Sequence, residues 1–131
     1  MARAITLWNN ASSGFSKELG GNARGVIVSQ VIPYERAHGL ALLREAQDLA
    51  RRKGIAELTP QMLEGFAAAK GLVEALRRAA PTPTRASARK ALDGLHAFDT
   101  GGLAISYSES QHAGLAFSDL AIINGSGRFE R

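Results

Sequence analysis

The fold is decided by one short aliphatic stretch, Gly25-Val26-Ile27-Val28-Ser29-Gln30-Val31-Ile32-Pro33. Five of the seven residues between its glycine and its proline are β-branched aliphatics, and the first half shows little alternation of apolar and polar side chains. Such a run is typical of a strand that is buried on both faces, as strands of parallel sheets are. Proline has no amide hydrogen to give to a sheet, so Pro33 ends the strand. The stretch therefore predicts a buried, parallel strand of an α/β domain.

Three helices are predicted after this strand. Residues 35–53 carry apolar side chains at spacings of three and four, which indicates an amphipathic helix. Thr59 is a suitable N-cap with proline directly after it, so a second helix should run over 60–79. Its middle is rich in glycine and alanine, which predicts close packing against another element. Thr84 is expected to cap a short third helix over 86–95.

Strands are predicted on both sides of these elements. Residues 4–8 are apolar and β-prone, and residues 103–107 and 117–123 alternate at least in part. Residues 126–131 are expected to form a polar tail. The predicted order is thus β, β, α, α, α, β, β, and the predicted fold class is α/β.

Composition sets further bounds. The chain has 131 residues, of which 45% are apolar, so one domain with a real core is possible. There is no cysteine, which excludes disulfides, thiolate metal sites and a cysteine nucleophile. No apolar run approaches the length of a transmembrane helix. The N-terminus lacks the apolar segment and cleavage site of a secretory signal, so we expect no signal peptide within this chain.

The polar residues do not form a catalytic pattern. His38, His96 and His112 lie in three separate segments, so we expect no metal site. No Gly-x-Ser-x-Gly elbow and no paired acid and base are present, so we expect neither an enzyme nor a cofactor. Asp99 precedes Gly101 and Gly102 closely, and a carboxylate in such a turn is expected to accept hydrogen bonds from the backbone that follows it.

The formal net charge is +4, which raises the possibility of nucleic-acid binding. The densest basic groups, residues 51–53 and 77–78, lie where helices are expected to end. Cations at those positions complement the helix dipole, and this interpretation is favoured over phosphate binding. A basic nucleic-acid binder built on residues 36–95 stays an alternative, as does a self-associating structural module without a ligand.

Several phrases of the sequence, taken in order, resemble a known family. They are Gly25–Pro33, Leu63-Glu64-Gly65-Phe66-Ala67-Ala68-Ala69-Lys70, Leu72-Val73-Glu74-Ala75-Leu76, Phe98-Asp99-Thr100-Gly101-Gly102 and Ser110-Gln111-His112-Ala113-Gly114. The ordered set is similar to the C-terminal portion of a type I periplasmic solute-binding protein of the branched-chain amino acid ABC-transporter class. This family resembles the Leu/Ile/Val-binding protein. The family usually has tyrosine at the position of Phe66.

The resemblance implies a fold and a division of the chain. The fold is expected to be a Rossmann-like three-layer fragment of one lobe of such a protein. Residues 1–131 are expected to form a single partial domain, the C-terminal third of a two-lobe protein. Within it, residues 1–33 correspond to second-lobe strands and the crossing of the hinge. Residues 34–98 correspond to the helical part, and residues 99–131 to the terminal strands.

The resemblance also implies a function. The full-length family member is a periplasmic receptor that binds an amino acid or a related small carboxylate and passes it to an ABC permease. This chain is expected to be a truncated fragment that lacks most of the ligand site, and its unpaired sheet edges predict a homodimer or a domain-swapped oligomer. The residues expected to form a wall of the cleft are Ser29, Gln30, Met62, Glu64 and Phe66.

Overall fold

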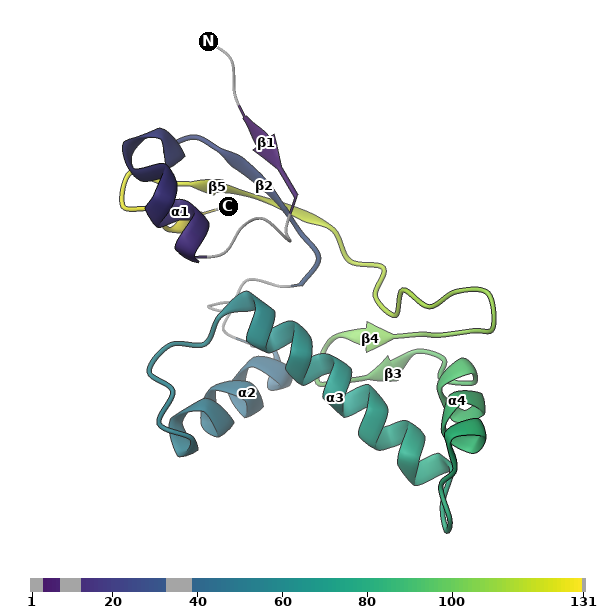
Figure 1. Ribbon diagram of the computed structural model, residues 1–131. Coiled ribbons are helices and arrows are strands. Elements are labelled where there is room, and N and C mark those ends of the chain that lie inside the picture. Colours follow the sequence, from purple (N-terminus) through teal and green to yellow (C-terminus); the bar gives the residue numbers. More distant parts are fainter. Residues whose placement is uncertain (1–3, 8–12, 33–38, 131) are drawn as a thin grey trace. The chain divides into compact units, whose positions relative to one another are not determined.

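The computed structural model describes residues 4–7, 13–32 and 39–130 (Figure 1). The chain divides into two compact units. The first joins Met1–Pro33 to Phe117–Arg131, and the second is Tyr34–Ala116. The structure contains both sheets and helices, so the predicted α/β class is confirmed. The predicted segments 1–33, 34–98 and 99–131 stay a prediction.

The first unit contains a four-stranded sheet in the order β1-β2-β5-β6. Its strands are β1 (Ile5–Thr6), β2 (Ile27–Gln30), β5 (Asp119–Ile123) and β6 (Phe129–Glu130). The predicted strand is present as β2, and its parallel pairing is confirmed on one side, with an antiparallel neighbour on the other. β2 pairs in parallel with β1 and antiparallel with β5. The reason is that the chain returns from the second unit in the opposite direction and adds β5 beside β2.

One face of this sheet is covered by α1 (Ser13–Leu19) and the 3₁₀ helix η2 (Gly20–Ala23). The core under them consists of Ala23, Val26, Val28 and Ile123, with Leu19 and Phe129 packed against it. Phe129 explains why the predicted polar tail is in fact strand β6. It is the one apolar side chain of residues 126–131, and its packing against the core brings the segment beside β5.

The second unit is built on the helices α2 (Ala41–Arg52), α3 (Pro60–Arg78) and α4 (Arg85–Asp93). The predicted N-caps are confirmed. Thr59 Oγ1 accepts a hydrogen bond from the Met62 amide at 3.3 Å. Thr84 and Ser87 form a reciprocal capping box, in which each hydroxyl accepts from the amide of the other residue, at 3.1 Å and 2.9 Å. The first part of the predicted helix 35–53 lies partly outside the described residues, and α2 begins at Ala41.

A small hairpin packs on α3. It consists of β3 (Phe98–Asp99) and β4 (Ala104–Ile105), which pair antiparallel. Gly71 in α3 is buried, and a Cβ atom there would lie 2.8 Å from Cδ1 of Ile105. This close approach explains the small residues in the middle of α3. The strand predicted over 103–107 is shorter than expected, and β3 was not predicted.

The turn of the hairpin behaves as the sequence predicts. Asp99 Oδ1 accepts hydrogen bonds from the amides of Gly101 at 2.9 Å and Gly102 at 2.5 Å. These two bonds, first that from Gly102 and then that from Gly101, hold the pKa of Asp99 below its usual value because they favour the charged carboxylate. The turn then carries Gly101 against the start of α2, where the Leu42 amide donates to the Gly101 carbonyl at 2.9 Å.

Candidate functional site

A pocket lies between α2 and α3, and two of the predicted site residues line it. Met62 and Phe66 are four residues apart on α3 and therefore face the same side of the helix. The other lining residues come from α2 and the loop after it: Ala46, Leu49, Ala50, Lys53, Ile55 and Leu58. The volume is about 140 Å³. Its walls are apolar apart from Lys53, so the pocket suits a small apolar group that carries a negative charge at one end.

Lys70 contacts both α2 and the Phe66 ring of this pocket. Its ammonium Nζ lies 2.5 Å from Glu45 Oε2, which ties α3 to α2. The same Nζ lies 5.8 Å from the centroid of the Phe66 ring, within the range of a cation–π contact. The Lys70 side chain is 24% exposed, so this pair is better shielded from water than the ion pair within α2 between Arg51 and Asp48. The position of the Phe66 ring is therefore supported by contacts outside the pocket.

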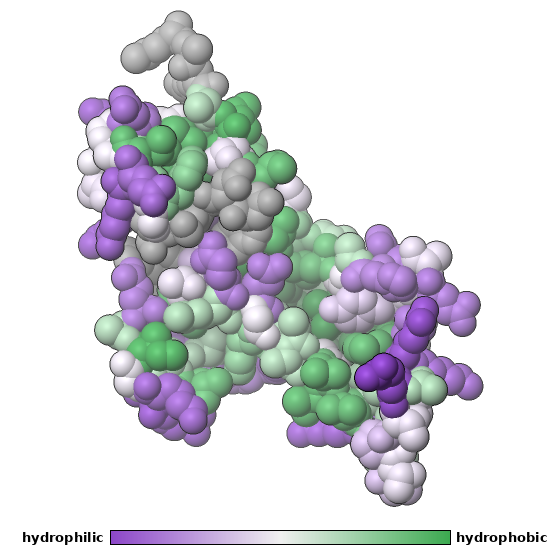
Figure 2. All heavy atoms as spheres, in the orientation of Figure 1, coloured by the Kyte–Doolittle hydropathy of each residue, from purple (hydrophilic) through white to green (hydrophobic). Residues whose placement is uncertain are grey.

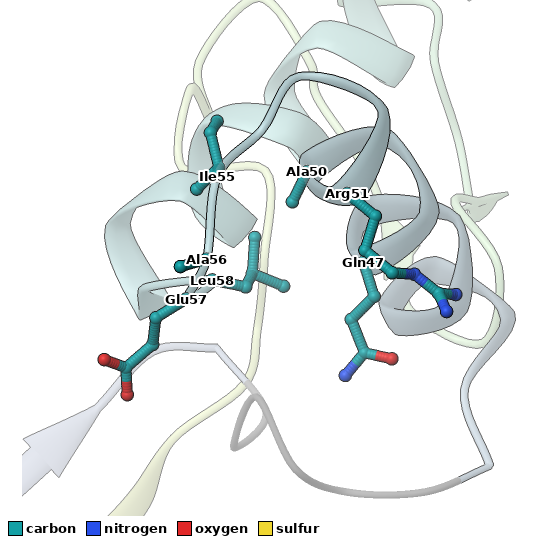
Figure 3. A pocket seen from close by; sticks show the side chains of 7 residues that line it. All are labelled: Gln47, Ala50, Arg51, Ile55, Ala56, Glu57 and Leu58. Atoms are coloured by element: carbon teal, nitrogen blue, oxygen red, sulfur yellow. The ribbon is translucent and has the colours of Figure 1, made fainter.

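A second, more polar pocket adjoins the first and shares Ala50, Ile55 and Leu58 with it. Its volume is about 360 Å³. Figure 3 shows Gln47 and Arg51 projecting from α2, with Ala56 and Glu57 on the loop that follows. The guanidinium of Arg51 also pairs with Asp48. The two pockets together give α2 and its loop an apolar surface edged by an amide, two cations and a carboxylate.

The remaining predicted residues are placed differently. Glu64 is exposed on α3 and does not line the pocket of Met62 and Phe66, because it lies between them in sequence and points to another side of the helix. Ser29 and Gln30 belong to β2 in the first unit, where neighbouring residues face opposite sides of the sheet. The structure therefore brings together Met62 and Phe66 among the five.

Gln30 carries an unusual polar atom. Its side chain is 2% exposed, and the amide nitrogen Nε2 has no hydrogen-bond partner among the residues that the structure describes. Leaving a buried donor unpaired costs about 1–3 kcal/mol, so most proteins avoid it. A group that is kept at such a cost is a candidate for contact with something outside the chain.

The sequence interpretation missed most of the residues that line the two pockets. They belong to α2 and to the loop between α2 and α3: Gln47, Leu49, Arg51, Lys53, Ile55, Glu57 and Leu58. One signal was available. Ile55 and Leu58 are large apolar residues in a short interhelical loop, and loops are usually polar. Such residues often lie over a neighbouring helix, as these do.

Residues 4–7, 13–32 and 39–130 contain no group of three histidine or acidic side chains that could hold a metal ion. Among those same residues, no helix combines the length and the apolar character that crossing a membrane requires. Within these ranges, the basic residues Arg51, Lys70, Arg78 and Arg89 pair with carboxylates.

The fold is that of known solute-binding proteins. A substrate-binding periplasmic protein from Ralstonia solanacearum is 28% identical and superposes with a TM-score of 0.86, covering 98% of this chain and 38% of that one. An extracellular ligand-binding receptor from Verminephrobacter eiseniae is 25% identical with a TM-score of 0.80, covering 97% of this chain and 37% of the receptor. A branched-chain amino acid ABC transporter protein from Thermus thermophilus, solved with bound valine, matches at 20% identity and a TM-score of 0.75, covering 98% and 37%.

These matches confirm the resemblance to periplasmic binding proteins, and they confirm the predicted fold class. The chain spans little more than a third of the length of the solved proteins. No protein-family model matches the chain, and no curated protein matches it. The chain thus has the fold of part of a type I periplasmic binding protein.

Proposed function

We propose that this chain forms part of the substrate-binding component of an ABC transporter for amino acids or related small carboxylates. The observation that carries the proposal is the match over 98% of the chain, at a TM-score of 0.86 and 28% identity, to a substrate-binding periplasmic protein. Such a component works in the periplasm and delivers its ligand to a membrane permease. The chain acts by binding and not by catalysis. Polypeptide with no counterpart in this sequence completes the ligand site.

The pocket between α2 and α3 supports this proposal. Phe66 and Met62 offer an apolar wall, and Lys53 provides a cation beside it. An apolar amino acid side chain fits the wall, and its carboxylate is attracted to the lysine. Glu64 is proposed as a contact at the outer surface of α3, where it is accessible to a second lobe or to a partner protein.

Gln30 and Ser29 are the contacts that we propose within the first unit. The unpaired Nε2 of Gln30 is a hydrogen-bond donor, and a ligand carboxylate or carbonyl is the kind of acceptor that satisfies it. Ser29 precedes Gln30 in β2 and faces the opposite side of the sheet, so the two residues are proposed as separate ligand contacts.

A second role, self-association, is proposed from the sheet of the first unit. Three large apolar side chains of this sheet region are strongly exposed. They are Ile5 in β1 at 70%, Leu7 just after β1 at 64% and Leu120 in β5 at 60%. By the register of β1, β2 and β5, Ile5 and Leu120 share the face opposite to the core residue Val28. An uncovered apolar sheet face favours burial against another chain. We propose a homodimer or a domain-swapped oligomer that covers it.

A ligand screen tests the receptor function. Thermal unfolding of the purified chain is followed with amino acids, aromatic acids and short-chain carboxylates. A ligand at a hundredfold over its dissociation constant adds about 2.7 kcal/mol of stability, which raises the melting temperature by several degrees. We expect a rise for one chemical class and its loss in Phe66→Ala. A cooperative melt that no class shifts contradicts the proposal.

Light scattering tests self-association separately. The expected molar mass is at least twice the 13.9 kDa of one chain. Leu120→Lys should convert the oligomer to a monomer, because a charge on this face opposes its burial. Leu76→Lys is the control, since Leu76 is also exposed, at 39%, but belongs to the second unit. A monodisperse wild-type monomer contradicts the proposed oligomer.

A further inference from the structure

A third cavity lies apart from the pockets of α2 and its loop. It is formed by α3, α4 and the segment after β4, and its volume is about 360 Å³. The lining residues are Ala68, Leu72, Arg89, Leu92, Asp93, Tyr107 and His112. Its floor is aliphatic, and its rim carries one cation, one anion, a phenol and an imidazole. That composition is typical of sites for small amphipathic molecules.

Two charges of opposite sign project from one helix into this cavity. Arg89 and Asp93 are four residues apart on α4 and share a face of it. Nε of Arg89 and Oδ2 of Asp93 are 3.7 Å apart. A strong charge-assisted hydrogen bond is shorter, at about 2.7–2.9 Å. The Arg89 side chain is 74% exposed and the Asp93 side chain is 18% exposed. Arg89 is therefore the solvent-exposed partner of a long ion pair, and Asp93 is its shielded partner.

The opposite wall is held in place by hydrogen bonds. The Ser106 amide donates to the Gly114 carbonyl at 2.8 Å, and Ser108 and Gln111 exchange amide-to-carbonyl bonds at 3.0 Å and 3.2 Å. The Tyr107 ring lies directly on Gly114, where a Cβ atom would come within 2.5 Å of the phenol oxygen. The loop therefore fixes Tyr107, and it carries His112 to the same cavity.

The floor is apolar surface that the described chain leaves open. Leu72 is 48% exposed; Val73 and Leu76, which also lie on α3 but do not line the cavity, are 47% and 39% exposed. Figure 2 shows hydrophobic residues gathered over the second half of α3, with hydrophilic residues beside them. An aliphatic side chain laid on Leu72 and Leu92 buries apolar area that water otherwise covers, at about 25 cal/mol per Å².

We propose that this cavity binds a zwitterionic amino acid with an apolar side chain, as a site separate from the pocket of Met62 and Phe66. Arg89 holds the carboxylate, Asp93 holds the ammonium group, and the side chain packs on Ala68, Leu72 and Leu92. A simple organic anion fits less well, because it places a second negative charge beside Asp93 and leaves that carboxylate without a new partner. Tyr107 and His112 close the wall facing α4.

The test follows the ring signals of His112 and Tyr107 by NMR while the chain is titrated with L-leucine. The two matched probes are N-acetyl-leucine, which lacks the ammonium group, and leucine methyl ester, which lacks the carboxylate. We expect saturable shifts with leucine and at least roughly tenfold weaker binding of either probe, because each loses a charge-assisted contact. N-acetyl-leucine binding as tightly as leucine overturns the zwitterion assignment. Absence of any shift up to about 10 mM leucine, tenfold over a dissociation constant of about 1 mM, overturns the site.

Variants locate the binding. Arg89→Gln and Asp93→Asn should each weaken leucine binding roughly tenfold, and Lys90→Gln should leave it unchanged. Lys90 is the matched control, because it is an exposed cation on the same helix that does not line the cavity. Phe66→Ala separates the two sites: shifts of the His112 ring that persist in this variant belong to the α3–α4 cavity. If Lys90→Gln weakens leucine binding as much as Arg89→Gln or Asp93→Asn does, the proposed contacts are contradicted. The result bears on this cavity alone, because the receptor function is read from Phe66.

Discussion

Gly101→Ala is expected to destabilise the second unit strongly. Gly101 has a φ of +117°, a backbone conformation that residues with a side chain rarely adopt. A Cβ atom there would lie 2.6 Å from the backbone nitrogen of Leu42 and 3.1 Å from its Cα atom. These are backbone atoms of the first turn of α2, so no side chain can move aside to make room. The Gly101 carbonyl also accepts the Leu42 amide, so the same shift strains the bond that caps α2.

The magnitude follows from these contributions. Forcing a residue with a Cβ into this φ costs about 1–3 kcal/mol, and the overlap with α2 costs a further 1–3 kcal/mol or so. The hydrogen bond to Leu42 contributes about 1 kcal/mol. We therefore expect Gly101→Ala to lower the free energy of unfolding by roughly 3–7 kcal/mol, and the melting temperature by about 10–20 °C.

Urea unfolding followed by far-ultraviolet circular dichroism measures this change. Gly65→Ala is the matched control, because Gly65 lies exposed in α3 and a Cβ atom there meets nothing within 4 Å. That substitution should raise the stability by up to about 1 kcal/mol, since alanine is the better helix former. A Gly101→Ala protein within about 1 kcal/mol of the wild type refutes the reasoning, because overpacking and strain would then be absent.

Three further predictions concern stability. Gln30→Met removes a buried donor without a described partner, so the free energy of unfolding should rise by about 1 kcal/mol. Ligand-induced stabilisation should fall in the same variant. A loss of stability in urea unfolding would show that the Gln30 amide is satisfied. Asp99 has a lowered pKa in the folded protein. Its contribution to the stability of the folded protein is therefore present above the unfolded pKa of about 3.9, and it is lost as the pH falls through the folded pKa. Asp99→Asn should therefore differ most from the wild type at neutral pH and converge with it in acid, and a pH-independent difference contradicts this. Thr84→Ala breaks the capping box of α4 and should cost about 1 kcal/mol in thermal unfolding, whereas an unchanged melting temperature argues against the cap.

The helices were predicted well because their start signals are local. Thr59 followed by proline, and Thr84 at the start of α4, act within one turn of their own helix, so the sequence alone places them. The turn at Asp99 is local for the same reason. The strands β3 and β6 were missed because each has two residues and exists only through its pairing partner. Phe129 gave a hint, but its packing against the core depends on residues about a hundred positions away.

The candidate site was predicted in part. The pair of Met62 and Phe66 follows from helical spacing, since residues four apart share a face. Their surroundings do not follow, because Lys53 and Ile55 reach the pocket only once α2 has packed against α3. The unpaired amide of Gln30 is likewise invisible in the sequence, because burial and missing partners are tertiary properties.

A titration followed by ¹H–¹⁵N correlation NMR tests whether this chain contributes to an amino acid receptor. Branched-chain amino acids are added to the labelled wild-type chain, and amide shifts are mapped onto the structure. We expect saturable shifts around Met62 and Phe66 and at the side-chain amide of Gln30, with little change at Lys17, an exposed residue that lines neither pocket of α2. Spectra in which none of these three residues responds, while the protein stays folded, contradict the receptor function.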